Sequence, residues 1–396
     1  MQASTNNLNQ GKAPETIFGQ WIGKFEGKSS QDGSFAFPGF ATFNIERDRP
    51  QSGFACIDQG QQIHGSRKDF TLQIGAGNRI TGQSASTIVF DWRKNETISV
   101  EESVRRQEGK VFYFEEITID EGFIDATTLT CSWHGKYRGQ SIPGTFNATR
   151  LKQSEPSQPD KIQSWEEFKR FAAELIKGRG KYIFRGQASS NHRLKTSFHR
   201  ENRYDLLRYN EEDCKRLEQH INATSFRQYN RSNPADFGAL LSLAQHHGFP
   251  TPLLDWSWSP YVAAYFALSS RLKTEPASDN HRIYVLDATA WKNDTAQALH
   301  FADPRPVITV EEFPAHNNPR HLPQQSVHAF SNVEDIEGWI RFRERINKRQ
   351  YLTIIDIPRL EREFAMRDLA YMGVTAASLF PGLDGVCRSL KEQFFP

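Results

Sequence analysis

The sequence has no apolar run that approaches the roughly 20 residues needed to cross a bilayer as a helix. Residues 1–14, MQASTNNLNQGKAP, are polar and lack the apolar core of a secretory signal peptide. We therefore expect a disordered start over residues 1–15 and a soluble cytoplasmic protein that does not enter membranes.

Cysteine is scarce, and several common catalytic motifs are missing. The four cysteines are scattered without metal-ligand spacing, which favours reduced thiols over a disulfide framework and predicts no metal site. The chain has no P-loop, no G-x-G-x-x-G after a predicted strand and no G-x-S-x-G elbow. Its formal net charge of +2 gives no strong sign of nucleic-acid binding.

Aromatic residues, by contrast, are abundant. They make up 12% of the chain and include 29 Phe, which favours packed, β-rich cores over disorder. A length of 396 residues exceeds a single average core, so two domains are expected. The polar, proline-bearing segment LKQSEPSQPD begins at Leu151. It predicts a linker over residues 151–161 between domains at 16–150 and 162–396.

Residues 16–150 consist of short aromatic and β-branched runs, with turn residues about every 8–12 positions and no helical period of useful length. This pattern predicts an antiparallel β-barrel or sandwich. The opening G-x-W-x-G around Trp21 resembles the start of a lipocalin- or avidin-like barrel. Trp21, Trp92 and Trp133 either line a ligand cavity or belong to the ordinary core. We expect a recognition module for an unidentified protein or ligand.

The second half alternates predicted helices and strands. Ser164 and Glu167 have the spacing of a capping box at a helix start. A later apolar run ends in Arg185-Gly186, and arginine is costly to bury without an anionic or planar partner. Arg185 therefore either forms a structural ion pair or is fixed to bind a phosphate or carboxylate. Further basic residues follow nearby, namely Arg193, Lys195 and Arg200.

Asp255 is the acidic residue that needs an explanation. It lies in a short predicted strand, Leu253–Trp256, before a helix that Ser257 or Ser259 can cap. A carboxylate at such a position either accepts backbone N–H groups or belongs to a functional site. Arg185 is its natural candidate partner.

Four separated motifs together resemble the FRG domain, which is named for a Phe-Arg-Gly motif. They are Phe184-Arg185-Gly186, the run from Ala244 to Ala267, the Arg320–Phe330 segment and the Thr375–Gly385 tail. The resemblance spans roughly residues 163–395. Because the family is defined by sequence, the resemblance by itself implies little about activity.

The order of strand-Arg, strand-Ser-helix and strand-Gln is similar to that of ADP-ribosyltransferases of the Arg–Ser–Glu type. This more distant resemblance implies a mixed α+β domain that takes NAD as its substrate. It implies that Arg185 anchors the NAD phosphate or ribose, that Asp255 lies in the serine motif and that Gln325 replaces the catalytic glutamate. The NAD-binding set it implies is Arg185, Gly186, Arg193, Ser257 and Tyr261. A neutral amide at Gln325 cannot stabilise positive charge as a carboxylate does. Either the chemistry therefore differs, or Asp255 is the true carboxylate, or the domain binds a nucleotide without turning it over.

Three functions follow as hypotheses. The first is an NAD-using enzyme, an ADP-ribosyltransferase or NAD glycohydrolase, with Arg185, Asp255 and Gln325 as catalytic residues. The second is a non-catalytic module that binds a nucleotide or a protein, with Arg185 in a structural ion pair. The third is a toxin or antiviral defence effector, in which the β-domain senses a trigger and the FRG domain acts.

Overall fold

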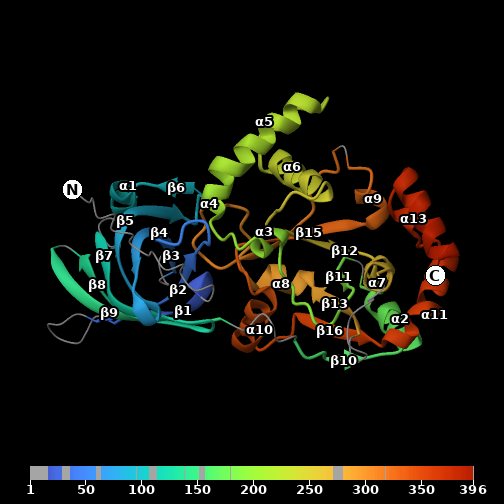
Figure 1. Cartoon of the computed structure of the whole chain (residues 1–396), viewed down its shortest axis with the longest axis horizontal. Helices are drawn as coiled ribbons and strands as arrows, with labels where there is room; N and C mark the ends of the chain where they lie inside the picture. Colours follow the sequence, from blue (N-terminus) through green and yellow to red (C-terminus); the bar gives the residue numbers. More distant parts are fainter. Residues whose placement is uncertain are drawn as a thin grey trace, which may run out of the picture. The chain divides into compact units, whose positions relative to one another are not determined.

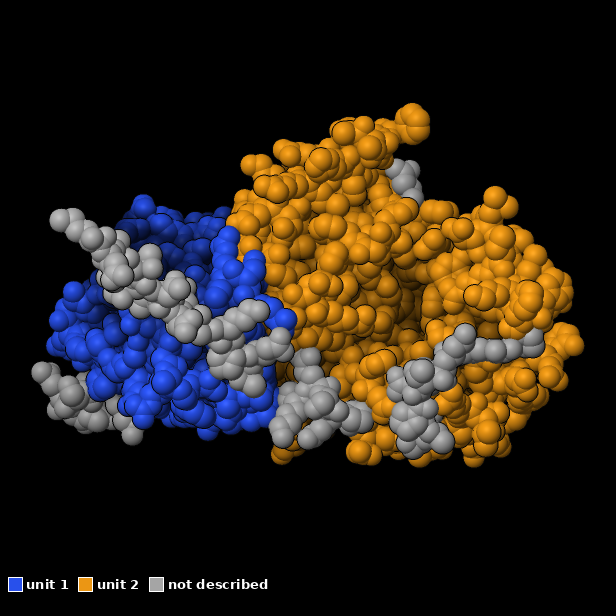
Figure 2. Space-filling model, viewed as in Figure 1, with its two compact units in different colours: residues 1–150, 302–305 blue, residues 151–301, 306–396 orange. Residues whose placement is uncertain are grey.

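The computed structural model describes residues 17–28, 36–58, 64–94, 96–106, 114–137, 139–150, 157–178, 180–270, 280–316 and 318–395. The predicted disordered start and residues 151–156 of the predicted linker lie outside this part. The chain forms two compact units, residues 1–150 with 302–305 and residues 151–301 with 306–396 (Figure 2). Residues 302–305 thus belong to the first unit, where the Arg305 guanidinium lies 4.8 Å from the centroid of the Trp92 ring.

Eight described strands of the first unit close an antiparallel barrel, which confirms the predicted β-barrel (Figure 1). Neighbours pair in the order β4-β3-β2-β1-β9-β8-β7-β5, and β4 pairs with β5 to close the ring. A short strand, β6 (Glu96–Ile98), pairs antiparallel with the end of β5. The barrel strands are β1 (Gly19–Lys28), β2 (Ala36–Ile45), β3 (Ser52–Asp58), β4 (His64–Ile74), β5 (Arg79–Asp91), β7 (Glu116–Ile124), β8 (Thr128–Tyr137) and β9 (Gln140–Thr149). The sequence shows no helical period here, yet one short helix, α1 (Val100–Arg106), follows β6.

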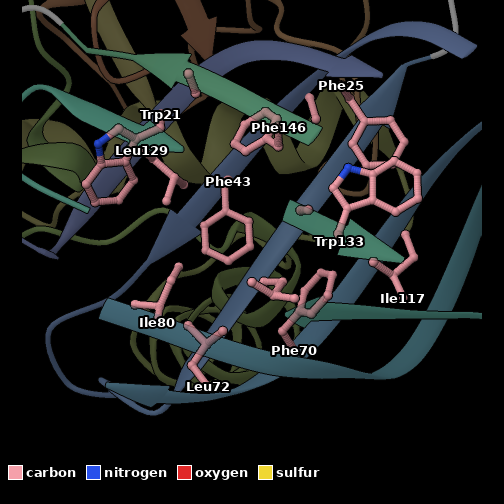
Figure 3. Packing of buried hydrophobic residues seen from close by; sticks show 14 of the residues in the cluster. Trp21, Phe25, Phe43, Phe70, Leu72, Ile80, Ile117, Leu129, Trp133 and Phe146 are labelled. Carbon is pink, nitrogen blue, oxygen red and sulfur yellow. The ribbon is translucent and has the colours of Figure 1, made fainter. Parts of the chain in front are cut away.

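Aromatic side chains fill the barrel interior (Figure 3). Trp21 and Trp133 are both buried in this core, and Trp133 stacks on Phe25 with ring centroids 4.4 Å apart. Gly144 makes room for Trp133, because a Cβ at Gly144 would lie 2.1 Å from the indole. A pocket of about 30 Å³ remains among the described side chains around Trp133. Trp21 and Trp133 therefore belong to the packed core of the described residues, and Trp133 also lines this small pocket.

One charged side chain lies among these buried residues. Lys68 lies two residues before Phe70 on β4, so both side chains are on the same face of the strand. Lys68 is only 1% exposed. Its ammonium donates to the Thr87 hydroxyl at 2.5 Å, to the Phe114 carbonyl and to the Glu115 carbonyl at 3.2 Å. Burial lowers the pKa of Lys68 to about 8. These hydrogen bonds hold Phe114 and Glu115, the two residues before β7, against β4.

The second unit is built on a mixed sheet of seven described strands in the order β10-β16-β13-β11-β12-β15-β14. Only the β10–β16 pair is parallel, and every other pair in this sheet is antiparallel. The strands are β10 (Lys161–Ile162), β11 (Tyr182–Gln187), β12 (Leu253–Ser257), β13 (His281–Asp287), β14 (Ile308–Glu311), β15 (Ser326–Ser331) and β16 (Leu352–Ile357). The second unit is therefore the mixed α+β domain that the sequence predicts.

Helices pack on both faces of this sheet (Figure 1). The longer ones are α2 (Trp165–Leu175), α5 (Lys215–Thr224), α6 (Pro234–His246), α7 (Pro260–Leu268), α8 (Ala288–Asp294), α10 (Ile336–Asn347), α11 (Arg362–Tyr371) and α13 (Leu383–Phe394). Shorter pieces are α3 (Ser197–Arg200), α4 (Leu206–Arg208), a π-helical stretch η3 (Tyr209–Cys214), α9 (His321–Gln324) and α12 (Ala376–Leu379). Ser164 and Glu167 form the predicted capping box of α2. No helix among the described residues is long and apolar enough to span a membrane.

Strand alternation assigns each side chain of β11 and β12 to one face of the sheet. Ile183, Leu254 and Trp256 pack in one cluster with residues of α8 and α10. Phe184 packs in a second cluster with residues of α2, α7 and α11. The first of these faces is called the α10 face below and the other the α7 face.

Candidate anion-binding pocket beside Arg185

A pocket of about 590 Å³ opens where β11 ends. Its wall comes from four places in the chain: the end of β11, the loop that follows it, α3, and the two residues before α10. Four basic side chains line it, Arg185, Arg193, Lys195 and Arg200. The volume falls within the range of about 300–1,000 Å³ that is usual for small-molecule sites.

The pairing of β11 fixes where Arg185 points. Phe184 pairs with Ser257 of β12, and Arg185 pairs with Tyr284 of β13. Because Phe184 packs on the α7 face, the next residue, Arg185, projects on the α10 face. Gly186 in turn allows α7 to approach the strand, since a Cβ there would lie 1.8 Å from the carbonyl oxygen of Ala263.

Among the residues that the structure describes, the main chain anchors the Arg185 guanidinium and no acidic side chain does. Its Nη1 donates to the carbonyl oxygen of Asp255 at 2.5 Å. Its Nε is buried and has no hydrogen-bond partner in the described part of the chain. Burial lowers the pKa of Arg185, the positive charge of Arg200 acts in the same direction, and Asp255 opposes them. The group is thus held in place while part of its donor capacity stays unused.

The expected ion pair between Arg185 and the carboxylate of Asp255 is absent. Leu254 and Trp256 pack on the α10 face, so the side chain of Asp255 between them lies on the other face. There its Oδ1 accepts from Nε2 of Gln245 at 2.6 Å and lies 3.6 Å from Nε2 of His328. The pairing prediction was wrong because sequence proximity to a strand end does not say which face a side chain occupies.

Arg193 and Lys195 are held by acidic residues at the start of α10. Arg193 pairs with Asp335 at 2.6 Å, and Lys195 pairs with Glu334 at 2.7 Å. Between these two pairs, the backbone N–H of Leu194 donates to Glu337 at 2.6 Å. Three consecutive loop residues are therefore fixed to one acidic segment. Arg193 lines the pocket, but its charge is already compensated by Asp335.

Of the other residues singled out in the sequence, only Gly186 lines this pocket. The hydroxyl of Ser257 donates to the Gln324 carbonyl at 2.7 Å, and the ring of Tyr261 packs edge-on against Trp165. Gln325 is exposed, in left-handed backbone conformation (φ 47°) after α9, and its carbonyl accepts from the N–H of Trp258. The structure thus groups Arg185, Gly186 and Arg193, and places Asp255, Ser257, Tyr261 and Gln325 outside the pocket.

The carboxylates of the pocket, Glu334 and Asp335, were missed by sequence reasoning. A signal for one of them was present, because Asp335 caps α10 by accepting from the N–H of Gly338 at 3.1 Å. The sequence alone could not place that helix start opposite the loop after β11. Within the described part of the chain, no group of three or more His, Cys, Asp or Glu residues could hold a metal ion.

Comparisons with known proteins cover parts of the chain. Among curated proteins, none matches it significantly. A crystal structure of Rv2717c from M. tuberculosis is similar over 34% of this chain and 93% of its own, with 10% identity and a TM-score of 0.21. Residues 180–276 match the family model of the FRG domain. This match includes Phe184-Arg185-Gly186 and the run from Ala244 to Ala267, and it confirms the FRG assignment for that part of the second unit.

Proposed function

We propose that the pocket beside Arg185 binds a phosphate-bearing nucleotide and that NAD is the ligand. The observation that carries this proposal is the state of Arg185. Its guanidinium lines the pocket and is anchored by a carbonyl, and among the described residues it binds no carboxylate and its buried Nε–H has no partner. Phosphate oxygens are the preferred partners of a guanidinium fixed in this way.

The proposed reaction is cleavage of the bond between nicotinamide and ribose. Nicotinamide leaves with the electron pair of that bond, and water or an acceptor hydroxyl adds to the ribose carbon and releases a proton. Positive charge develops on the ribose in such a step, so a nearby carboxylate stabilises it. Glu334 and Asp335 are the carboxylates of the pocket. They are better placed for this role than Asp255 or the neutral Gln325, because neither of those lines the pocket.

A specific observation favours a second candidate function, a non-catalytic module. Arg185 bonds to the main chain of Asp255, and Arg193 and Lys195 are both in ion pairs. In that case these contacts serve to hold β11, β12 and the start of α10 together. Replacing Arg185 would then lower stability, and no nucleotide would bind.

Incubation of the purified protein with NAD, with nicotinamide followed by chromatography, separates the two candidates. Calorimetric titration with NAD measures binding without turnover. Arg185→Lys keeps the charge but loses the planar fork, and we expect it to weaken binding about tenfold. The matched control is Arg216→Ala on α5, an exposed arginine outside the pocket. Wild-type protein that neither binds NAD nor releases nicotinamide would overturn the NAD proposal.

For the first unit we propose partner binding through the outer surface of the barrel. The support is the packing of the described interior side chains, among which a pocket of only about 30 Å³ remains. Joined to an NAD-consuming FRG domain, this arrangement suits a toxin or defence effector. Growth arrest on expression that Arg185→Lys relieves is the expected result. A harmless wild type at high expression would contradict the effector role.

A further inference from the structure

The basic side chains of the pocket fall into two classes. Arg193 and Lys195 each pair with a carboxylate, at 2.6 and 2.7 Å. Arg185 and Arg200 pair with none in the described part of the chain. Arg185 bonds only to a carbonyl, and the exposed side chain of Arg200 has no hydrogen-bond or ion-pair partner there. The pocket therefore holds two uncompensated guanidinium groups, one from β11 and one from α3.

These two groups are close enough to repel each other. The charge of Arg200 contributes to lowering the pKa of Arg185. A single phosphate bound to Arg185 relieves this repulsion only in part, whereas two linked phosphates can give each guanidinium its own anion. A hydrogen bond between a phosphate oxygen and a guanidinium is charge-assisted and stronger than a neutral one, so the second phosphate adds binding free energy.

We propose that the pocket selects ligands with two adjacent phosphate groups and that Arg200 binds the second phosphate. The inference rests on the proposed function, because it names the substrate class of the same pocket. It assigns the diphosphate as the recognised feature, and a ligand that carries one phosphate lacks the group that Arg200 contacts.

Calorimetric titration of the full chain with ADP, AMP, inorganic pyrophosphate and inorganic phosphate, at constant ionic strength, tests this selection. We expect ADP to bind at least about tenfold more tightly than AMP, and pyrophosphate to show the same preference over phosphate. Arg200→Ala should remove most of the ADP preference and leave AMP binding nearly unchanged. Arg200 is exposed, so the variant should fold, which circular dichroism checks. Arg216→Ala is the matched control and should keep the wild-type ratio.

The outcomes separate this inference from the proposed function. Equal affinity for ADP and AMP, or an Arg200→Ala variant that weakens both equally, overturns the diphosphate selection while a phosphate site remains. Failure of every phosphate compound, NAD included, to bind overturns the proposed function and this inference together. Diphosphate selection that persists in Arg200→Ala shows that another residue binds the second phosphate and overturns the assignment to Arg200.

Discussion

Arg185 and Asp255 meet through the main chain, with the guanidinium on one face of the sheet and the carboxylate on the other. Nη1 of Arg185 donates to the Asp255 carbonyl at 2.5 Å, and the Asp255 carboxylate accepts from Gln245 at 2.6 Å. The Arg185 side chain thus bonds to the main chain of Asp255, while the charges of the guanidinium and the carboxylate are not paired. The positive charge of an arginine positioned by a neutral carbonyl remains uncompensated and can attract an anionic ligand, whereas a salt bridge would compensate it.

This arrangement predicts that Asp255→Asn changes the dissociation constant of the ligand by less than about twofold. A tenfold change would correspond to about 1.4 kcal/mol of binding free energy. The carbonyl that holds Arg185 is unchanged in this variant, and Asn retains a side-chain acceptor for Gln245. Titration with ADP or NAD measures the effect, with Arg185→Lys as the variant that should lose affinity. If Asp255→Asn weakens binding as much as Arg185→Lys does, the Asp255 carboxylate takes part in the site after all.

A second prediction concerns Gly186, which the sequence marks as a ligand-binding glycine. A Cβ at this position would lie 1.8 Å from the Ala263 carbonyl of α7, so Gly186→Ala must push the helix away from the strand. Overpacking of this kind costs about 1–3 kcal/mol of unfolding free energy. Urea denaturation measures the loss.

Gly178→Ala is the matched control, because the atoms nearest to its added Cβ are 3.8 Å away. It should change the unfolding free energy by less than about 0.5 kcal/mol. If Gly186→Ala and wild type have equal unfolding free energies, α7 can shift without loss of stability. The close approach of α7 would then not explain why position 186 is a glycine.

The sequence predicts local features here better than spatial ones. The capping box at Ser164 and the strand that carries Arg185 follow from short patterns, so both could be recognised without a structure. The partner of Arg193 could not, because Asp335 lies 142 positions further along the chain. Which face Asp255 occupies depends on the register of β12 with its neighbours. The register of a strand with its neighbours is set when the sheet assembles, so it cannot be predicted from a short stretch of sequence.

A third prediction is a loss of stability in acid that depends on His328. This side chain is fully buried, its Nδ1 has no hydrogen-bond partner within the described ranges, and burial lowers its pKa to about 4. An unfolded chain binds a proton on this residue below its ordinary pKa of about 6.5, while the folded chain does not. Stability therefore falls as the pH drops from about 6.5 to about 4. The full effect of this one group is about 3 kcal/mol.

His328→Gln cannot titrate and keeps a polar group that can bond to Ser242, the present partner of Nε2 at 3.1 Å. Urea denaturation at pH 7.5, 6.0 and 5.0 should show a smaller loss for this variant than for wild type. The difference between the two proteins isolates His328, because His199 is also buried with a pKa of about 3 and titrates in both. Parallel pH profiles would contradict the assignment.

The last prediction concerns Lys68 inside the barrel, whose pKa of about 8 reflects burial that the charges of Glu115 and Glu116 only partly offset. Between pH 8 and 10.5 the unfolded chain binds a proton on Lys68 that the folded chain has lost, so this group makes stability rise with pH in that window. The gain in unfolding free energy over the whole window is about 3 kcal/mol, and it is absent from Lys68→Met.

In protein labelled with ¹³C at the lysine Cε, one resonance should titrate near pH 8 and vanish in Lys68→Met. If every lysine titrates near 10.4, the ammonium of Lys68 is better solvated than its position among Thr87, Phe114 and Glu115 implies.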